Sequence, residues 1–267
     1  MSKLSVVTWN INSVRLRAGR VADFLKSHAP DVLCLQEIKC REAQFPASVF
    51  NDLGYTHMQI AGQKGLHGVA TVSRLPIEQL AAPELCGLGH ARIAASRIAG
   101  YEVHNIYLPA GGDEPDPDIN DKFAHKLDFL ARMERYYGAH DPASPLIVVG
   151  DLNIAPQEHD VWSHKQLLKV VSHTPVETEA MARIIEAGQF CDLARREHPA
   201  DQKLFSWWSY RAKDWAASNR GRRLDHIWAN PAAEPKAVPG TYKIHIEERG
   251  GVKPSDHAPV AMTFEGL

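Results

Sequence analysis

The chain has 267 residues, 44% of them hydrophobic and 23% charged. This composition is typical of a globular protein with one large core and excludes a disordered chain or a small disulfide scaffold. Its 30 basic and 32 acidic residues give a formal charge of -2, so bulk charge does not indicate a nucleic-acid partner, which would need a local basic face. No linker, low-complexity tract or repeat divides the chain, and we expect a single domain over residues 1–267.

The N-terminal segment and the cysteines indicate a compartment. The first ten residues lack the apolar stretch of a signal peptide, and no run is apolar enough to span a membrane. No cysteine has C-x-x-C spacing, so we expect reduced structural thiols at Cys34, Cys40, Cys86 and Cys191. We therefore expect a cytoplasmic protein without membrane contacts.

Apolar periodicity predicts a mixed α and β fold. Short apolar runs predict strands, in chain order, at residues 4–8, 32–35, 67–73, 93–98, 101–108, 146–149, 224–228 and 260–264. Helical spacing predicts helices over residues 19–27, 119–137 and 176–187, the last closed by Gly188. The pattern favours an α+β or α/β protein with mixed sheets.

Polar residues lie at the ends of several predicted strands. Asn10, Glu37, Asp151 and Asn153 follow strands, whereas Asp256 and His257 precede the last one. Strand ends on one side of a sheet converge, so these residues are expected to share one site. A glutamate in this position is a plausible Mg²⁺ ligand, because Mg²⁺ favours carboxylates together with water and phosphate oxygens. The alternative for Glu37 alone is a solvated loop carboxylate.

The segment GDLNIAP places Asp151 and Asn153 two residues apart after a buried strand. In an extended chain their side chains would point the same way and could orient a water or hold a phosphate oxygen. An Asx-turn that caps the loop is the alternative.

The segment PSDHAPV places His257 between a proline turn and a strand. A carboxylate partner would fix its tautomer and support the imidazolium. We expect Asp225 of the segment RRLDHIWA to be that partner, which leaves Asp256 free to face a metal.

A basic and aromatic segment spans residues 203–223. It carries one acidic residue, Asp214, and six basic residues, Lys203, Arg211, Lys213, Arg220, Arg222 and Arg223. Aromatic residues alternate with them at Phe205, Trp207, Trp208, Tyr210 and Trp215. Basic side chains with aromatics hold phosphates while stacking on or wedging against bases, so we expect nucleic-acid contact here. A core hairpin with a solvated edge is the alternative.

Eight motifs occur in the order found in the exonuclease III family of abasic-site endonucleases: WNIN, PDVLCLQEIK, GQKGLHGVA, NIYLPAG, GDLNIAP, FSWWSYR, RRLDHIWA and PSDHAPV. The sequence resembles that family over nearly its whole length. The resemblance implies a four-layer αββα sandwich, with two mixed β-sheets face to face and helices outside. It also implies a hydrolase that depends on Mg²⁺, with Mn²⁺ as a substitute ion. In this reaction water attacks phosphorus in line and expels the 3′-oxygen, which leaves 3′-OH and 5′-phosphate ends.

Residue by residue, the resemblance implies that Glu37 is the principal metal ligand and that Asn10, Asp151, Asn153, Asp256 and His257 complete the metal and phosphate site. Tyr107 matches the family's catalytic tyrosine, and His257 paired with Asp225, or else Asp151, would activate the water. Trp207, Leu224 and Arg222 would line a pocket for a flipped-out abasic sugar. Further candidate DNA contacts are Arg15, Lys39, Lys64 and Arg211.

Two departures from the family pattern leave the balance of activities open. An acidic stretch, residues 111–118, follows Tyr107 where relatives often carry a basic or polar residue, and acid there weakens phosphate contact unless the loop turns to solvent. Arg222 also makes the pocket less apolar. We expect a monomer that acts on double-stranded DNA with abasic sites or 3′ ends, with 3′-to-5′ exonuclease and 3′-phosphatase activities as additions.

Two other functions fit parts of the sequence. A superfamily phosphatase acting on inositol phosphates or lipids would share the metal and histidine machinery but has no use for FSWWSYR. A non-catalytic DNA-binding module should have lost catalytic residues, and none is missing.

Overall fold

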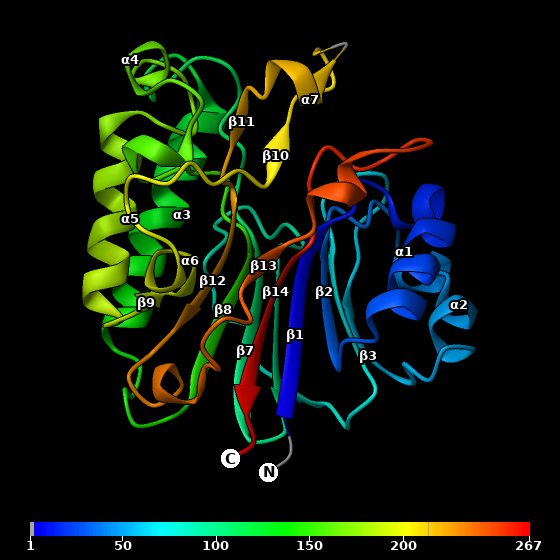
Figure 1. The fold of residues 1–267 in the computed structure, drawn as a ribbon. Coiled ribbons are helices and arrows are strands. Elements are labelled where there is room, and N and C mark those ends of the chain that lie inside the picture. The colour runs from blue at the N-terminus through cyan, green and yellow to red at the C-terminus, as the bar shows by residue number, and fades with distance from the viewer. Residues whose placement is uncertain (1–2, 213) are drawn as a thin grey trace.

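The computed structural model describes residues 3–212 and 214–267, so Lys213 of the basic segment lies outside the described residues. Two six-stranded sheets stand face to face (Figure 1). The first has the order β13-β14-β1-β2-β4-β3, with β13 Lys243–Ile244, β14 Val260–Glu265, β1 Lys3–Asn10, β2 Val32–Gln36, β4 Val69–Ser73 and β3 His57–Ala61. The second has the order β5-β6-β7-β8-β12-β9, with β5 Glu78–Leu80, β6 Ile93–Ile98, β7 Tyr101–Tyr107, β8 Leu146–Asp151, β12 Asp225–Ala229 and β9 Cys191–Asp192.

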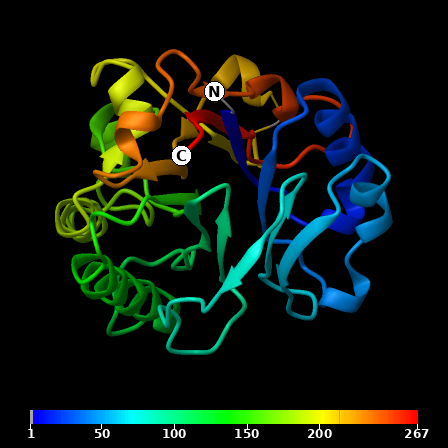
Figure 2. The ribbon, with the colours of Figure 1, turned by 90° about the horizontal axis from the view of Figure 1, so that it is seen from below.

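Helices cover the outer face of each sheet. The α-helices are α1 Val14–His28, α2 Ala47–Asn51, α3 Asp121–Gly138, α4 His164–Leu167, α5 Pro175–Ala187, α6 Leu193–Glu197 and α7 Trp215–Ser218. Short 3₁₀ turns span Glu42–Gln44, Glu158–Asp160, Glu234–Lys236 and Ile246–Arg249. Seen from below, α1 and α2 lie on one side of the paired sheets and α3 and α5 on the other (Figure 2). The predicted four-layer sandwich is confirmed. Among the described residues, no helix has the length and apolarity needed to cross a bilayer.

Alternation along the strands explains the layers. Val6 of β1 packs between the sheets with Ile147 of β8, whereas its neighbour Val7 packs outward with Phe24 of α1. In β8, Val148 turns outward toward Met181 of α5. Because successive strand residues point to opposite faces, each apolar strand supplies both the central core and one helix-covered core.

The predicted helices are present with shifted starts. The first begins at Val14 rather than residue 19, and it is kinked at Arg17 (φ -116°, ψ 16°), whose guanidinium donates to the Ile11 carbonyl. The side chain of Asn120 caps α3 at its N-terminus. Pro175 occupies the first turn of α5, where a missing N–H is tolerated, and Gly188 follows the helix as expected.

The eight predicted strands are confirmed within a few residues. Other strands were not predicted, because their sequences contain no apolar run. The missed strands β13, β3, β5 and β9 are the four edges of the two sheets. Edge strands are short and half exposed, so they lack the continuous hydrophobic pattern of central strands. The remaining pair, β10 Trp207–Trp208 and β11 Gly221–Arg222, forms a separate hairpin above the sheets (Figure 1).

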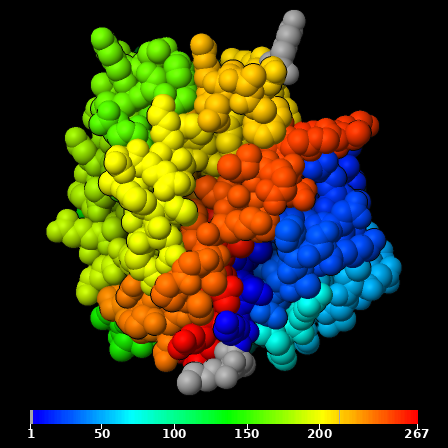
Figure 3. All heavy atoms as spheres, in the orientation of Figure 1, coloured from blue at the N-terminus to red at the C-terminus, as the bar shows by residue number. Residues whose placement is uncertain are grey.

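The sheet topology brings the functional residues to one end. Strands β1 and β2 are parallel, as are β7 and β8, so Asn10 and Tyr107 lie at carboxyl ends. Antiparallel pairing of β12 with β8 sets Asp225 opposite Asp151. At the same end, residues near 208 contact residues near 249 through the Arg249 guanidinium and the Trp208 carbonyl (Figure 3). This contact ties the basic and aromatic segment to the loop that leads to His257.

Candidate active site

Asn10, Glu37 and Asp151 form the centre of the site. The Asn10 Nδ2 donates to Glu37 Oε1 over 2.9 Å and to Asp151 Oδ2 over 2.8 Å. Glu37 follows β2 with a left-handed backbone (φ 50°), which turns the chain sharply at the strand end. One amide thus connects residues from both sheets, and the predicted convergence of strand ends is observed.

Glu37 is surrounded by donors. Tyr107 donates its hydroxyl to Glu37 Oε1 over 2.9 Å, and Lys39 Nζ lies 2.8 Å from Oε2. Burial alone would raise the pKa of Glu37, but Lys39 and Asn10 outweigh it and hold that pKa below its usual range. Glu37 is therefore an ionised carboxylate at neutral pH. Lys39, a predicted DNA contact, lies against the proposed metal ligand.

His257 is held between two carboxylates. Its Nδ1 lies 2.8 Å from Asp225 Oδ2, and its Nε2 lies 3.7 Å from Asp151 Oδ2. Ser206 Oγ donates to the same Asp225 oxygen over 2.6 Å, and Trp9 Nε1 donates to the His257 carbonyl over 3.0 Å. The expected pairing of Asp225 with His257 is present.

The electrostatics of this pair follow from burial and from the excess of carboxylates. Burial alone would lower the pKa of His257, but Asp225 and Asp151 raise it to about 10. Burial, assisted by Asp225 and Glu37, raises the pKa of Asp151 to about 7. His257 is thus an imidazolium at neutral pH, whereas Asp151 is poised to gain or lose a proton.

Asn153 meets Asp151 through a turn rather than an extended chain. Its backbone is left-handed (φ 51°), and its Nδ2 donates to Asp151 Oδ2 over 3.2 Å and to the Leu108 carbonyl over 2.9 Å. The Asn153 N–H donates to Asp151 Oδ1 over 3.0 Å, so the Asx-turn is also present. The expectation of an extended chain is therefore wrong, and the alternative of an Asx-turn is present.

Tyr107 and Asp256 flank the centre. Burial, Glu37 and Asp151 raise the pKa of Tyr107 well above its usual range, so its hydroxyl stays protonated and can donate. Asp256 accepts from Asn12 Nδ2 and from Trp207 Nε1, each over 3.0 Å. Both carboxylate oxygens of Asp256 are therefore engaged by donors.

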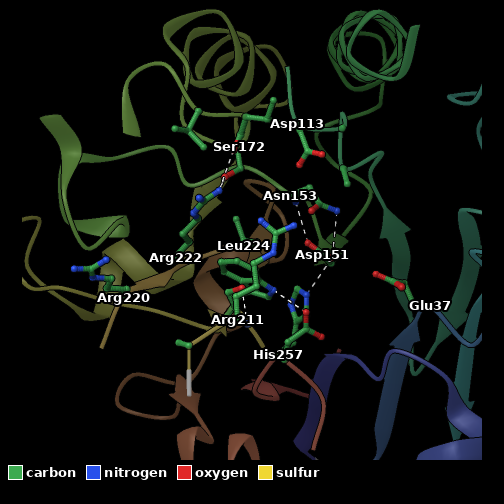
Figure 4. Close-up of a pocket in the computed structure, with 18 of the residues that line it drawn as sticks. Glu37, Asp113, Asp151, Asn153, Ser172, Arg211, Arg220, Arg222, Leu224 and His257 are labelled. Carbon is green, nitrogen blue, oxygen red and sulfur yellow. Dashed lines mark hydrogen bonds and ion pairs between the residues drawn. The ribbon is translucent and has the colours of Figure 1, made fainter. Parts of the chain in front are cut away.

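A cavity of about 690 Å³ opens beside these residues. Figure 4 shows Leu224 at its floor, Arg211 extending into it, and Asp113 at its rim. Arg222 stacks over the Trp207 ring at 5.3 Å and donates to Ser172 Oγ over 2.6 Å and to the Val171 carbonyl over 3.0 Å. The predicted pocket residues thus share one cavity, whose wall is partly cationic.

The basic and aromatic segment has two faces, so the count of six basic residues overstates the charge that faces the cavity. Arg223 is fully buried away from it, with Asp160 and Asp192 as partners. Phe205 and Trp208 are buried in a small core with Ala258. The core alternative applies to these residues, while Arg211, Arg220 and Trp207 line the cavity.

The remaining predicted contacts lie further out. Arg15 and Lys64 are exposed, on α1 and on the loop before β4 respectively. In the acidic stretch, Asp113 and Glu114 are exposed, and Asp113 also lines the cavity. The sequence predicts that acid here weakens phosphate contact unless the loop turns to solvent. Because Asp113 lines the cavity, the loop does not turn wholly away from it.

Three supporting residues escaped the sequence interpretation. Asn12 bridges Asp256 and Lys39, with Lys39 Nζ 2.5 Å from its Oδ1. Ser206 holds Asp225, and Ser172 holds Arg222. Asn12 and Ser206 belong to the motifs WNIN and FSWWSYR, which also contain the predicted site residues Asn10 and Trp207. Their place beside those residues in the sequence could have indicated a supporting role.

The site combines several carboxylates with hydrogen-bond donors, and it lies beside an arginine-lined cavity at one end of a four-layer sandwich. These features are typical of hydrolases that act on phosphate esters. A family model described as the Endonuclease/Exonuclease/phosphatase family matches residues 7–257. The chain belongs to this family.

Individual relatives match along the whole chain. An exodeoxyribonuclease III from Haemophilus influenzae is 30% identical, with 98% of this chain and 100% of that protein covered. A solved AP endonuclease from Archaeoglobus fulgidus has a TM-score of 0.90 and 32% identity, covering 98% and 99% of the two chains. The 3′ phosphatase NExo from Neisseria, solved with a product DNA hairpin, has a TM-score of 0.88 and 29% identity, covering 98% and 99%.

These relatives confirm the predicted resemblance to the exonuclease III family and the predicted enzyme class, a hydrolytic nuclease of DNA repair. They favour that prediction over the alternative of a phosphatase acting on inositol phosphates or lipids.

Proposed function

We propose that this protein is a Mg²⁺-dependent DNA repair phosphodiesterase that hydrolyses the phosphodiester 5′ to abasic sites in double-stranded DNA. The products carry 3′-OH and 5′-phosphate ends, and 3′-to-5′ exonuclease and 3′-phosphatase activities accompany the main one. The observation that carries the proposal is the cavity in which Trp207, Arg222 and Leu224 adjoin the Glu37, Asp151 and His257 cluster.

The residues present fit a hard divalent cation. Glu37 and Asp151 supply carboxylate oxygens, which are the ligands that Mg²⁺ prefers, and the Asn10 Nδ2 holds the two carboxylates together. Among the described residues, the four carboxylates Glu37, Asp151, Asp225 and Asp256 outnumber the cations that lie against them, Lys39 and His257. A bound Mg²⁺ would neutralise negative charge that develops on the phosphate. We propose Glu37 as principal ligand, with Asn10, Asp151, Asn153, Asp256 and His257 around the metal and phosphate.

The protein's own groups have complementary roles in this proposal. Asp151, with a pKa near neutrality, accepts the proton of the attacking water. His257 is kept in its protonated form by the charge of its two carboxylate neighbours and stabilises the phosphate charge, while Asp225 orients its ring. Tyr107 stays neutral and donates its hydroxyl to the scissile phosphate or the leaving 3′-oxygen.

The cavity accounts for the lesion preference in this proposal. An abasic residue has no base to unstack, so its extrusion requires less free energy than that of an intact nucleotide. The Trp207 ring, Leu224 and Arg222 would line the pocket for the bare sugar, and Arg211 would contact a flanking phosphate. The negative charge of Asp113 at the rim disfavours a DNA phosphate there. The DNA strand is therefore expected to cross the cavity away from Asp113. Lys39, Arg15 and Lys64 are proposed as outer DNA contacts.

The test is a parallel assay of cleavage on an abasic duplex, a duplex with a 3′-phosphate at a nick, and an inositol polyphosphate, with Mg²⁺ and then Mn²⁺. Cleavage of the abasic duplex and no turnover of the inositol polyphosphate are expected. Glu37→Gln should raise the Mg²⁺ concentration for half-maximal rate by about tenfold or more while DNA affinity stays near wild type, since an ionised ligand is lost.

Glu248→Gln is the matched control, because Glu248 is exposed to a similar extent, 22% against 19% for Glu37, and also pairs with a cation. An unchanged Mg²⁺ requirement in Glu37→Gln would overturn the ligand role. Preferred turnover of the inositol polyphosphate would overturn the DNA function.

We further propose that the chain acts as a single-domain monomer in the cytoplasm. Light scattering of the purified protein with and without an abasic duplex tests the monomer, and a second copy in either state contradicts it.

A further inference from the structure

A second cluster of metal-binding side chains lies outside the active site. Cys86 and His90 belong to the segment between β5 and β6, and His125 belongs to α3. One ligand atom from each of the three lies within 4.8 Å of the other two. None of the three lines the cavity beside Glu37. The cluster therefore calls for a separate explanation.

The spacing of the cluster suits a tetrahedral ion. Cys86 Sγ and His125 Nε2 are 3.4 Å apart. Bonds of about 2.3 Å to sulfur and about 2.0 Å to nitrogen in tetrahedral geometry hold those two atoms about 3.6 Å apart. The two side chains are therefore already near the separation that a shared zinc ion requires, although they come from segments 39 residues apart.

The state of His90 favours a ligand as well. Within the described residues, its Nδ1 is buried and has no hydrogen-bond partner. Buried polar atoms without partners are uncommon in folded proteins, and a metal or another ligand is one way to satisfy them.

We propose that Cys86, His90 and His125 form a binding site for a borderline divalent transition metal, Zn²⁺ in the first place. The thiolate and imidazole donors differ in kind from the carboxylate and amide oxygens at Glu37, which suit Mg²⁺. A hollow beside the cluster is lined by Cys86 and His90 together with Glu84, Arg92 and Arg132, so an ion could reach the two ligands from solvent.

The cluster is close to Tyr107, the proposed catalytic tyrosine. The His90 ring stacks on His67 with centroids 4.8 Å apart, and the Arg92 guanidinium lies 4.8 Å over the Tyr107 ring. An ion that joins this segment to α3 would therefore restrain the chain that carries Arg92. Zinc binding is a property of this cluster alone and does not depend on the DNA activity.

The experiment uses the full chain with millimolar Mg²⁺ present, so that the hard site is occupied. Zn²⁺ binding is followed by calorimetry, and Co²⁺ serves as the spectroscopic probe because a cobalt–thiolate bond gives charge-transfer absorption in the near ultraviolet. Wild type should bind one Zn²⁺ per chain and show the thiolate band. Cys86→Ser should abolish the band and weaken Zn²⁺ binding at least about 10²-fold, more than the loss of an outer-shell partner.

Cys191→Ser is the matched control, since Cys191 is likewise a partly buried free cysteine but lies on β9. It should keep both the band and the affinity. His90→Gln on the loop is a second variant in case Cys86→Ser does not fold, and it should weaken Zn²⁺ binding to a similar extent. No bound Zn²⁺ in wild type, or equal binding in wild type and the cluster variants, would overturn the proposal.

Discussion

Two buried charge clusters adjoin the start of the strand β12 and have opposite balances. In one, Arg223 bonds to Asp160 and Asp192, and Arg195 adds a second cation at 2.5 Å from Asp160. In the other, four carboxylates lie around the cations of Lys39 and His257. The first cluster has as many cations as carboxylates, whereas in the second the carboxylates outnumber the cations that lie against them.

The pKa shifts report the same difference. In the balanced cluster, burial would raise the pKa of Asp160, but Arg223 and Arg195 lower it, so every carboxylate there has a cation. In the unbalanced cluster, burial and like charge raise the pKa of Asp151 instead. An excess of buried carboxylates therefore separates a functional site from a structural ion pair, even where both derive from the single motif RRLDHIWA.

The largest expected effect is on turnover, from His257→Gln. Loss of the imidazolium should lower the rate on an abasic duplex by about 10²- to 10⁴-fold, the scale for a proton-transfer group or charge stabiliser, with the fold intact. Single-turnover kinetics measure the rate, and circular dichroism checks the fold. Asp225→Asn should act in the same direction because it releases the ring, and full activity in that variant would refute the pairing.

The second effect is on stability, from Arg223→Met. Removal of Arg223, which bonds both Asp160 and Asp192, deprives Asp192 of its cation and leaves Asp160 with Arg195, and it should lower the free energy of unfolding by about 3–5 kcal/mol. Urea titration measures this loss, and the rate per folded molecule should stay within about twofold of wild type. A large loss of turnover without a loss of stability would mean that the two clusters are not separable in this way.

The difference between the two clusters also explains which parts of the site could be predicted from the sequence. Asn10, Glu37, Asp151 and His257 were predictable because each stands at the end of an apolar strand, and strand ends converge. The role of Arg223 was not, because a local count of charge cannot tell which basic side chains turn inward to Asp160, 63 residues away. The edge strands and the kink at Arg17 depend on tertiary contacts, which no local pattern records.

The third effect is on the pH dependence of stability. The pKa of Asp151 is about 7 in the folded protein against 3.8 ordinarily, so the folded state holds a proton that the unfolded chain releases. Stability without metal should therefore fall as pH rises from about 4 to 7, and Asp151→Asn should remove that part of the slope. Melting temperatures of wild type and Asp151→Asn, measured in EDTA between about pH 4 and pH 7, should change with pH by amounts that differ by more than about 2 °C. Parallel trends would show that Asp151 ionises normally.

The smallest effect separates two arginines of the same basic segment, Arg211 and Arg223. Arg211 is exposed and extends into the cavity, where a phosphate could reach it, whereas Arg223 is buried with its own carboxylates. Each phosphate contact in duplex DNA contributes about 0.9 to the slope of log affinity against log salt. Arg211→Ala should therefore flatten that slope by about one contact and weaken binding to abasic and intact duplexes alike. Arg97→Ala, at an exposed ion pair with Glu78 on the edge of the second sheet, is the control and should leave the slope unchanged. A slope that stays at the wild-type value in Arg211→Ala would place the phosphates elsewhere, and the cationic wall at Arg222 and Arg220 would then be the next to test.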